Sequence, residues 1–109
     1  MNDARFPWLI LVPRIADISD YTALPARAQA ALWDEIGRCA QALKALYAPT
    51  RVNIGLLGNL VPQLHAHVVA RFDHDAAWPG PVWGSGPAVA YDPSAATACV
   101  RAIGRALDC

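Results

Sequence analysis

The 109-residue sequence has no excess of charge of either sign, since nine Lys and Arg residues balance nine Asp and Glu residues. Proteins that bind nucleic acid by general electrostatic attraction carry a basic excess, so the composition does not support that class. The sequence also lacks an apolar run long enough to cross a bilayer. It opens without the basic and apolar stretches of a secretory leader. We therefore expect a cytoplasmic protein that binds neither nucleic acid nor membrane.

Cysteine is scarce and shows no pairing pattern. The three residues Cys39, Cys99 and Cys109 are odd in number, and no two have the Cys-x-x-Cys spacing. This argues against a disulfide framework and against a zinc site built on thiolates. Apolar residues make up 55% of the chain and charged residues 17%, which is typical of a folded protein. The length suits a single domain over residues 1–109.

The first half of the chain predicts a strand and a long helix. Trp8–Val12 is a continuous apolar run, which predicts a strand buried on both faces and ended by Pro13. From Pro25 to about Tyr47, apolar residues recur at steps of three and four, which predicts an amphipathic helix. Pro25 suits the first helical position, and Thr22 is an alternative cap.

The second half predicts a hairpin, an irregular segment and a second helix. Arg51–Leu57 and Gln63–Phe72 alternate between apolar and polar residues, with turn-like residues between them, which is typical of an antiparallel hairpin. Residues 73–93 are rich in Pro and Gly, and Asp92-Pro93 marks the start of a helix. Together these elements predict an α+β fold, an antiparallel sheet with one long helix packed across it and a C-terminal helix.

The stretch from Gln63 to His67 carries the clearest chemical signal. Because side chains alternate along a strand, Gln63, His65 and His67 are expected on one face, with the apolar opposite face against the helix. Successive side chains on a face are about 6.6 Å apart, so they can converge on one small anion. A neutral imidazole can act as a nucleophile or carry a proton, and two on a rigid strand can divide these roles.

Two other interpretations of the histidine pair stay open from the sequence alone. The pair could simply lie on a solvated strand face. It could also chelate zinc, since two imidazoles two residues apart can share a metal ion. A third strong ligand is not evident, because Asp73, His74 and Asp75 lie beyond the strand. We predict no metal and no other cofactor.

Several motifs together resemble the histidine-triad (HIT) family. Gln63–Val69 resembles its signature His-φ-His-φ-His-φ-φ, in which φ is apolar, as found in a bacterial subgroup with Gln at the first histidine position. Four other stretches match as well. Leu9–Arg14 resembles the family's strand before the main helix, and Leu32–Glu35 resembles that helix. Val52-Asn53 resembles the strand before the signature, and Trp78–Gly84 resembles the tail of a bacterial subgroup. The resemblance extends from about residue 2 to residue 84, and it implies a HIT-like fold.

The resemblance implies roles for five residues besides Gln63. His65 matches the central histidine, which attacks the α-phosphorus and becomes a nucleotidyl-histidine. His67 matches the third histidine, which contacts phosphate oxygens and the leaving-group side. Asn53 matches a position near the phosphate, Asn59 one near the leaving group, and Asn2 one that contacts ribose. The alternatives are an exposed strand residue for Asn53, a turn residue for Asn59 and a terminal residue for Asn2.

The sequence departs from the family pattern in two places. Gln63 can form hydrogen bonds through its amide but cannot carry a proton or a positive charge, so the site has one titratable group fewer than the family pattern. Family domains also carry further strands ahead of the position of Met1. Either Met1 is an internal methionine of a longer protein, or this domain lacks those N-terminal strands.

The resemblance implies a homodimeric hydrolase or transferase that binds nucleotides. Its substrate would be a nucleoside monophosphate linked to a phosphate or amine leaving group, as in dinucleoside polyphosphates or nucleoside phosphoramidates. The alternatives are a nucleotide-binding dimer with weak or no catalytic activity, and a protein with a purely structural role in an assembly. The first alternative follows from Gln63, because that residue removes one titratable group from the site.

Overall fold

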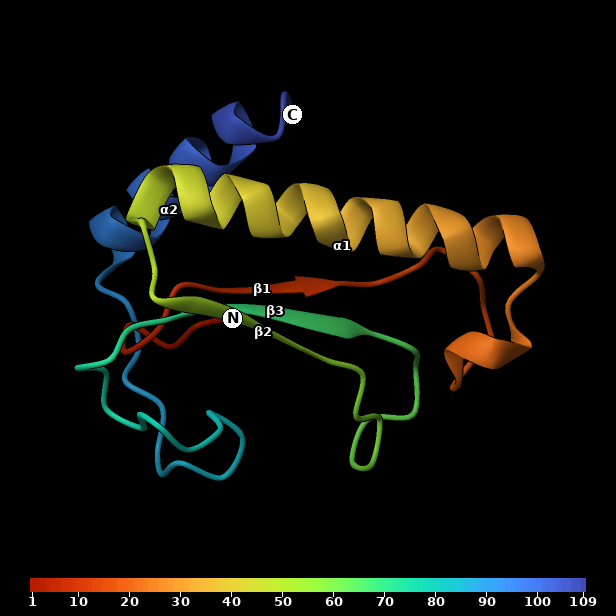
Figure 1. Cartoon of the computed structure of the whole chain (residues 1–109), viewed down its shortest axis with the longest axis horizontal. Coiled ribbons are helices and arrows are strands. Elements are labelled where there is room, and N and C mark those ends of the chain that lie inside the picture. The colour runs from red at the N-terminus through yellow and green to blue at the C-terminus, as the bar shows by residue number, and fades with distance from the viewer.

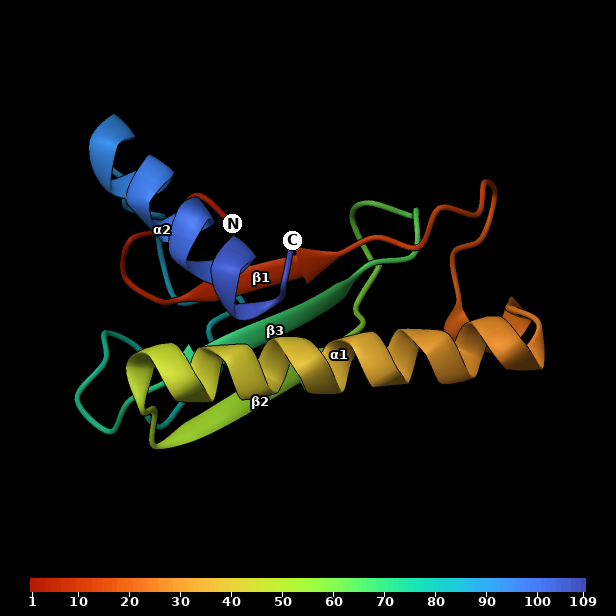
Figure 2. The ribbon, with the colours of Figure 1, turned by 90° about the horizontal axis from the view of Figure 1, so that it is seen from above.

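A computed structural model describes residues 1–109. Its elements are β1 (Trp8–Leu11), the short 3-10 helix η1 (Tyr21–Ala23), α1 (Ala26–Tyr47), β2 (Arg51–Gly55), β3 (Ala66–Arg71) and α2 (Pro93–Ala106). The strands form an antiparallel sheet in the order β1-β3-β2, α1 lies across one face, and α2 packs beside α1 (Figures 1 and 2). The predicted α+β fold is confirmed. None of the helices has the length and apolar character needed to span a membrane.

The central strand β3 separates two clusters of buried residues. All six of its residues are buried, because it is paired on both edges and covered on both faces. Ala66, Val68 and Ala70 pack with the apolar stripe of α1, which includes Leu32, Ile36 and Leu43. His67 and Val69 face the other way, where Val69 packs in a second, smaller cluster. The alternation of apolar and polar faces along this strand is therefore as predicted.

The ends of α1 differ in detail from the prediction. Pro25 occupies the N-cap position rather than the first helical position, and no side chain caps the helix. Thr22 lies in η1, where its backbone N–H binds the Asp20 carboxylate at 2.8 Å. The helix stops where Ala48 takes a left-handed conformation with φ of 46°. Pro49 follows and lacks the N–H that a further helical turn would use.

The prediction that the first strand is buried on both faces is wrong. β1 forms one edge of the sheet and pairs only with β3. Ile10 lies opposite His67 in this ladder and is 39% exposed, because α1 covers only the other face. Val12 lies beyond the strand and is also exposed. A run of apolar residues therefore predicted the strand correctly but not its position at the sheet edge.

The predicted hairpin between β2 and β3 is confirmed, but its connection is longer than predicted. Pro62 has no N–H to donate to a ladder. The N–H of Leu64 donates to the carbonyl of Ile18 at 2.8 Å instead of to β2. Residues 63–65 therefore form a loop beside the connection that precedes η1, and the regular strand begins only after them.

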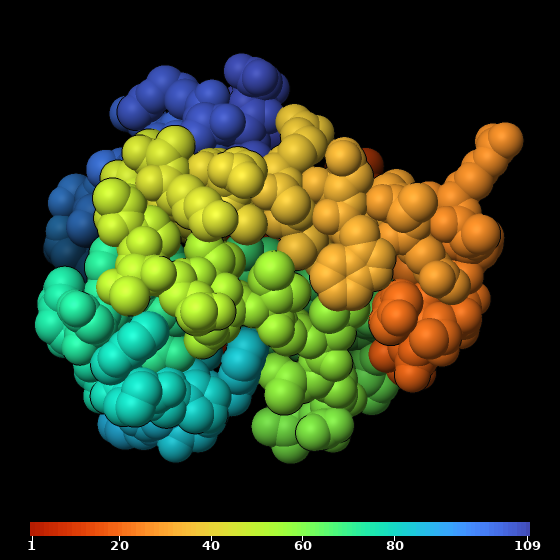
Figure 3. All heavy atoms as spheres, in the orientation of Figure 1, coloured from red at the N-terminus to blue at the C-terminus, as the bar shows by residue number.

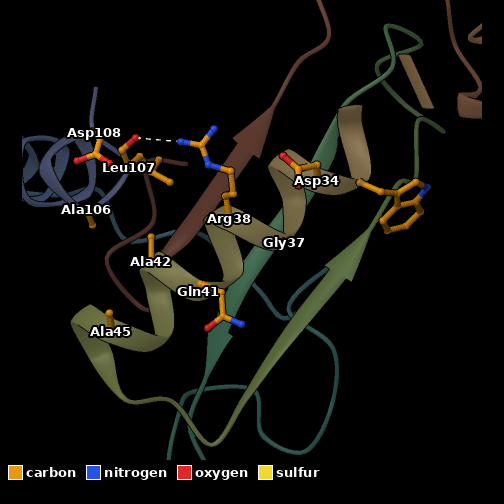
Figure 4. Close-up of a pocket in the computed structure, with 10 residues that line it drawn as sticks. Asp34, Gly37, Arg38, Gln41, Ala42, Ala45, Ala106, Leu107 and Asp108 are labelled. Carbon is orange, nitrogen blue, oxygen red and sulfur yellow. Dashed lines mark hydrogen bonds between the residues drawn. The ribbon is translucent and has the colours of Figure 1, made fainter. Parts of the chain in front are cut away.

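The C-terminal helix begins at Pro93 as predicted and packs against α1. Arg38 of α1 donates a hydrogen bond to the carbonyl of Leu107 at 3.2 Å across a shallow pocket between the two helices (Figure 4). The Tyr47 hydroxyl lies 3.5 Å from the sulfur of Cys99. Burial, together with this contact, raises the pKa of Tyr47 to about 12.

Candidate active site

His65 is held in one orientation by the backbone just before it. Its Nδ1 lies 2.7 Å from the carbonyl oxygen of Gln63, and the side chain is partly exposed. A carbonyl can only accept a hydrogen bond, so Nδ1 of a neutral ring must carry the hydrogen. The other ring nitrogen, Nε2, then holds a free lone pair. This tautomer follows from the hydrogen-bond partners and is the one that a nucleophilic histidine requires.

His67 has the opposite tautomer. The indole N–H of Trp8 donates a hydrogen bond to its Nδ1 at 3.0 Å, and both side chains are buried. Because Nδ1 accepts this bond, the hydrogen of the neutral ring lies on Nε2. Burial lowers the pKa of His67, and the neighbouring His65 and the amino group of Met1 lower it further. His67 is therefore a neutral ring that offers an N–H donor.

The two imidazoles lie next to each other although only one belongs to the regular strand. Their ring centroids are 4.9 Å apart and their planes are inclined at 71°. One ring presents a lone pair and the other presents an N–H. An electrophilic centre that carries oxygens, such as a phosphorus, could meet the lone pair of His65 while His67 donates to one of its oxygens.

A tryptophan from the irregular segment closes the space beside His67. The Trp83 ring lies 5.5 Å from the His67 ring and 6.3 Å from the Trp8 ring, with edge-to-face geometry in both pairs. It covers Gly55 of β2, where an added Cβ would lie 2.8 Å from the indole ring. Glycine at this position therefore permits the close approach of the indole to the sheet. The indole nitrogen of Trp83 is buried without a hydrogen-bond partner.

Asn53 is fixed on the same face of the sheet by a buried arginine. Arg71 donates from Nη1 to the side-chain oxygen of Asn53 at 2.8 Å, which leaves the amide nitrogen to act as a donor. The register explains the shared face, since Asn53 pairs with Val69 and Gly55 pairs with His67. Asn53 is thus on the histidine face of the sheet, two residues along β2 from Gly55.

Arg71 itself was not singled out by the sequence analysis. Its side chain is 1% exposed and forms two hydrogen bonds to the Asp75 carboxylate, at 2.8 and 3.0 Å. Its Nη2 also donates to the carbonyl of Gly80 at 2.8 Å. Through these bonds Arg71 ties the segment that carries Trp83 to the sheet. An arginine at the end of an apolar strand that is followed by an acidic residue four positions later was the only signal in the sequence.

The other three predicted site residues have side chains that form no hydrogen bond with either imidazole ring. The Gln63 side chain donates to the carbonyl of Ile15 at 3.3 Å, so only its backbone takes part in orienting His65. Asn59 is exposed in the loop after β2. The side-chain oxygen of Asn2 accepts a hydrogen bond from the N–H of Tyr91 at 2.9 Å. The substrate-binding roles of Asn53, Asn59 and Asn2 stay predictions.

A cavity opens beside His65 on the side of η1. It has a volume of about 560 Å³, and its walls include Tyr21, Trp33 and Leu57. The surface is also hollowed between the loop that follows β2 and the segment that follows β3 (Figure 3). No three His, Cys, Asp or Glu side chains come together in a way that could hold a metal ion. The histidine pair thus has open space on the side of His65 and tryptophan walls on the side of His67.

The family model described as HIT domain matches residues 1–74. No curated protein sequence matches the chain.

Among solved structures, a histidine triad protein from Bradyrhizobium japonicum is 44% identical, with a TM-score of 0.95, over 98% of this chain and 80% of its own. One from Sinorhizobium meliloti 1021 is 45% identical, with a TM-score of 0.94, over 96% of this chain and 78% of its own. One from Marinobacter aquaeolei VT8 is 38% identical, with a TM-score of 0.96, over 99% and 79%. The family match and these likenesses agree with the resemblance seen in the motifs, and this chain belongs to the HIT domain family.

Proposed function

We propose that this protein is a nucleotidyl hydrolase or transferase that forms a covalent intermediate on His65. Its substrates would carry a nucleoside monophosphate joined to a phosphate or amine leaving group, as in dinucleoside polyphosphates and nucleoside phosphoramidates. Membership of the HIT domain family supports the nucleotide-binding hydrolase or transferase class. The observation that carries the finer proposal is the hydrogen bond from Nδ1 of His65 to the Gln63 carbonyl, because it leaves Nε2 free to attack.

The reaction would proceed in two displacements. Nε2 of His65 donates its lone pair to the α-phosphorus, and the bond from phosphorus to the leaving oxygen or nitrogen breaks with its electron pair. In the second step, water attacks the phosphorus, the bond from phosphorus to Nε2 breaks, and the ring recovers its lone pair. The two hydrogens of the water molecule account for the protons taken up by the leaving group and released to solvent. Another hydroxyl or amine in place of water would give transfer.

His67 would stabilise the charge that develops on the phosphate. Its Nε2–H is a neutral donor in a buried setting, where a preorganised hydrogen bond to an oxyanion is stronger than in water. The free amide N–H of Asn53 would serve a second oxygen. Both donors lie on the face of the sheet that α1 leaves uncovered. This division of roles matches the tautomers that the hydrogen bonds impose on the two rings.

Glutamine in place of histidine at position 63 does not remove the hydrogen bond that orients His65. The bond that orients His65 comes from the backbone carbonyl of Gln63, which any residue would supply. The Gln63 side chain instead contacts the carbonyl of Ile15. This observation favours an active enzyme over the alternative of a nucleotide-binding protein that has lost its chemistry.

We also infer that the protein is a homodimer. β2 forms an open edge of the sheet, with backbone groups on its outer side that no strand of this chain pairs. Ile54 of β2 and the nearby Trp33 and Leu57, which also line the cavity beside His65, are large apolar side chains that are 43% to 44% exposed. An open edge with exposed apolar neighbours is a natural surface for a second copy. Sedimentation equilibrium of wild type and Ile54→Lys tests this, since the substitution should shift the mass toward the monomer.

Substitution of the nucleophile tests the enzymatic proposal. His65→Asn should reduce hydrolysis of diadenosine tetraphosphate by at least about 1,000-fold, because loss of a covalent nucleophile removes the first displacement. His74→Asn is the matched control, since that histidine is 81% exposed on a loop and its ring forms its one hydrogen bond with Asp73. Calorimetry with AMP should show similar affinity in both variants.

Three other results would change the conclusion. Equal turnover in wild type and His65→Asn would contradict the role of His65. AMP binding without turnover in the wild type would support the non-catalytic dimer. Absence of both binding and turnover would favour a structural role.

A further inference from the structure

We propose that Trp8 is a positioning residue for the reaction, because its indole N–H fixes the tautomer of His67. The inference rests on the proposed function, in which His67 donates a hydrogen bond to the phosphate. It concerns a residue that lies in the strand before the main helix, far from the histidines in the sequence.

The register of the sheet brings the indole to the imidazole. Trp8 pairs with Val69 in the ladder of β1 and β3, and Ile10 pairs with His67. Residues that are diagonal neighbours on one face lie within reach of a long aromatic side chain. Trp8 and His67 are such neighbours, and their rings are 5.6 Å apart with a nitrogen-to-nitrogen distance of 3.0 Å.

Packing prevents the indole from turning away from His67. Trp8 is 8% exposed and lies between Phe6 and Trp83, each with its ring centroid 6.3 Å away in edge-to-face geometry. An indole nitrogen donates and never accepts. A hydrogen on Nδ1 of His67 would therefore point at another hydrogen, with neither group able to reach water. Both the Nδ1–H tautomer and the doubly protonated ring are disfavoured at this place.

The direction of this bond decides what His67 presents to the substrate. With Nδ1 occupied by the indole, Nε2 carries the hydrogen and can donate to a phosphate oxygen. In the other tautomer, Nε2 would direct a lone pair at the negatively charged phosphate. Since Nδ1 of His65 is already held by a carbonyl, the two rings have opposite tautomers for two separate structural reasons.

Trp8→Phe removes the indole N–H while it keeps an aromatic ring. Trp83→Phe is the matched control for the spectra, because Trp83 also packs on His67 but its indole nitrogen has no partner. Histidine side-chain 15N spectra at pH 7.5 without substrate should show His67 as the Nε2–H tautomer in wild type and Trp83→Phe. In Trp8→Phe the Nδ1–H tautomer should appear. A 15N–15N coupling across the bond from Trp8 to His67 should be visible in the wild type.

The kinetic readout separates this proposal from the proposed function. Trp8→Phe should lower kcat for diadenosine tetraphosphate about 10- to 100-fold, by analogy with the loss on removal of the partner that orients a metal-binding histidine, with little change in AMP affinity. The proposal is overturned if the wild type shows His67 as Nδ1–H, or if the tautomer changes while kcat does not. The wild-type spectrum alone shows which tautomer His67 adopts, even if Trp8→Phe fails to fold. A wild type without turnover contradicts the proposed function and the kinetic role of Trp8, whereas the spectra still decide the tautomer.

Discussion

The buried ion pair behind the site offers the clearest test of the energetics. Each oxygen of the Asp75 carboxylate accepts more than one hydrogen bond. Oδ2 accepts from Nε of Arg71 and from the N–H of Phe72, and Oδ1 accepts from Nη2 of Arg71 and from the N–H groups of Ala77 and Trp78. In Asp75→Asn, one of these oxygens becomes an amide nitrogen that faces at least two donors in either orientation. The arginine is also left without its counter-charge.

The expected cost is a large part of the total stability. The side chains of Arg71 and Asp75 are 1% and 3% exposed, and removal of one partner of a buried pair costs about 3–5 kcal/mol. A domain of this size unfolds with a free energy of about 5–15 kcal/mol. Urea denaturation at pH 7 should show this loss for Asp75→Asn. Asp73→Asn is the control, because that side chain is 71% exposed and its substitution should cost less than about 1 kcal/mol.

The same carboxylate predicts a dependence on pH. Burial acts to raise the pKa of Asp75, but the Arg71 hydrogen bonds and the three backbone N–H donors outweigh it and hold the pKa well below the ordinary value of 3.8. A lowered carboxyl pKa gives stability that is present above pH 3.8 and is lost as the pH falls below it. Asp75→Asn should lack this loss. An Asp75→Asn protein that is within about 1 kcal/mol of wild type at pH 7 would refute the reasoning.

Three further predictions follow from the site. Gly55→Ala should destabilise the protein by about 1–3 kcal/mol, because the new methyl group meets the Trp83 ring. In the control Gly37→Ala the new methyl group on α1 has no neighbour within 4 Å, so this substitution should stabilise the protein by up to about 1 kcal/mol. Gln63→Ala should change kcat for diadenosine tetraphosphate less than about tenfold, since the backbone carbonyl orients the nucleophile; a larger loss would contradict that assignment. Burial and neighbouring positive charge lower the pKa of His67, so its contribution to stability is complete above about pH 6.5 and is lost as the pH falls. Urea denaturation at pH 5 and 7 should show a smaller loss of unfolding free energy between these pH values in His67→Asn than in wild type. Equal losses in the two proteins would contradict this role of His67.

Local patterns predicted most of the fold. The 3.6-residue spacing in Pro25–Tyr47 predicted the buried side of α1, and the period of two in Gln63–Phe72 predicted the two faces of β3. Both patterns reflect which side of an element is removed from water, and the sequence records that directly. The position of β1 at the edge could not be predicted, because pairing order depends on contacts far apart in the chain.

The histidine pair was predicted, but the groups that control it were not. Alternation placed His65 beside His67, and the structure brings their rings together even though His65 lies in a loop. The indole of Trp8 and the carbonyl of Gln63 set the two tautomers. A pattern of residue types does not show which nitrogen meets which partner, since that depends on strand register and on the exact end of β3. The hydrogen bonds of Arg71 to Asn53 and to the Gly80 carbonyl were missed for the same reason.

Detection of the covalent intermediate tests the central claim most directly. Wild-type protein mixed with diadenosine tetraphosphate and quenched in alkali, where a phosphorus–nitrogen bond survives, should gain the mass of one adenylate. Peptide mapping should place the group on His65, and the His65→Asn protein should gain none. An adduct on another residue, or turnover by the wild type with no adduct at any time, would contradict the account.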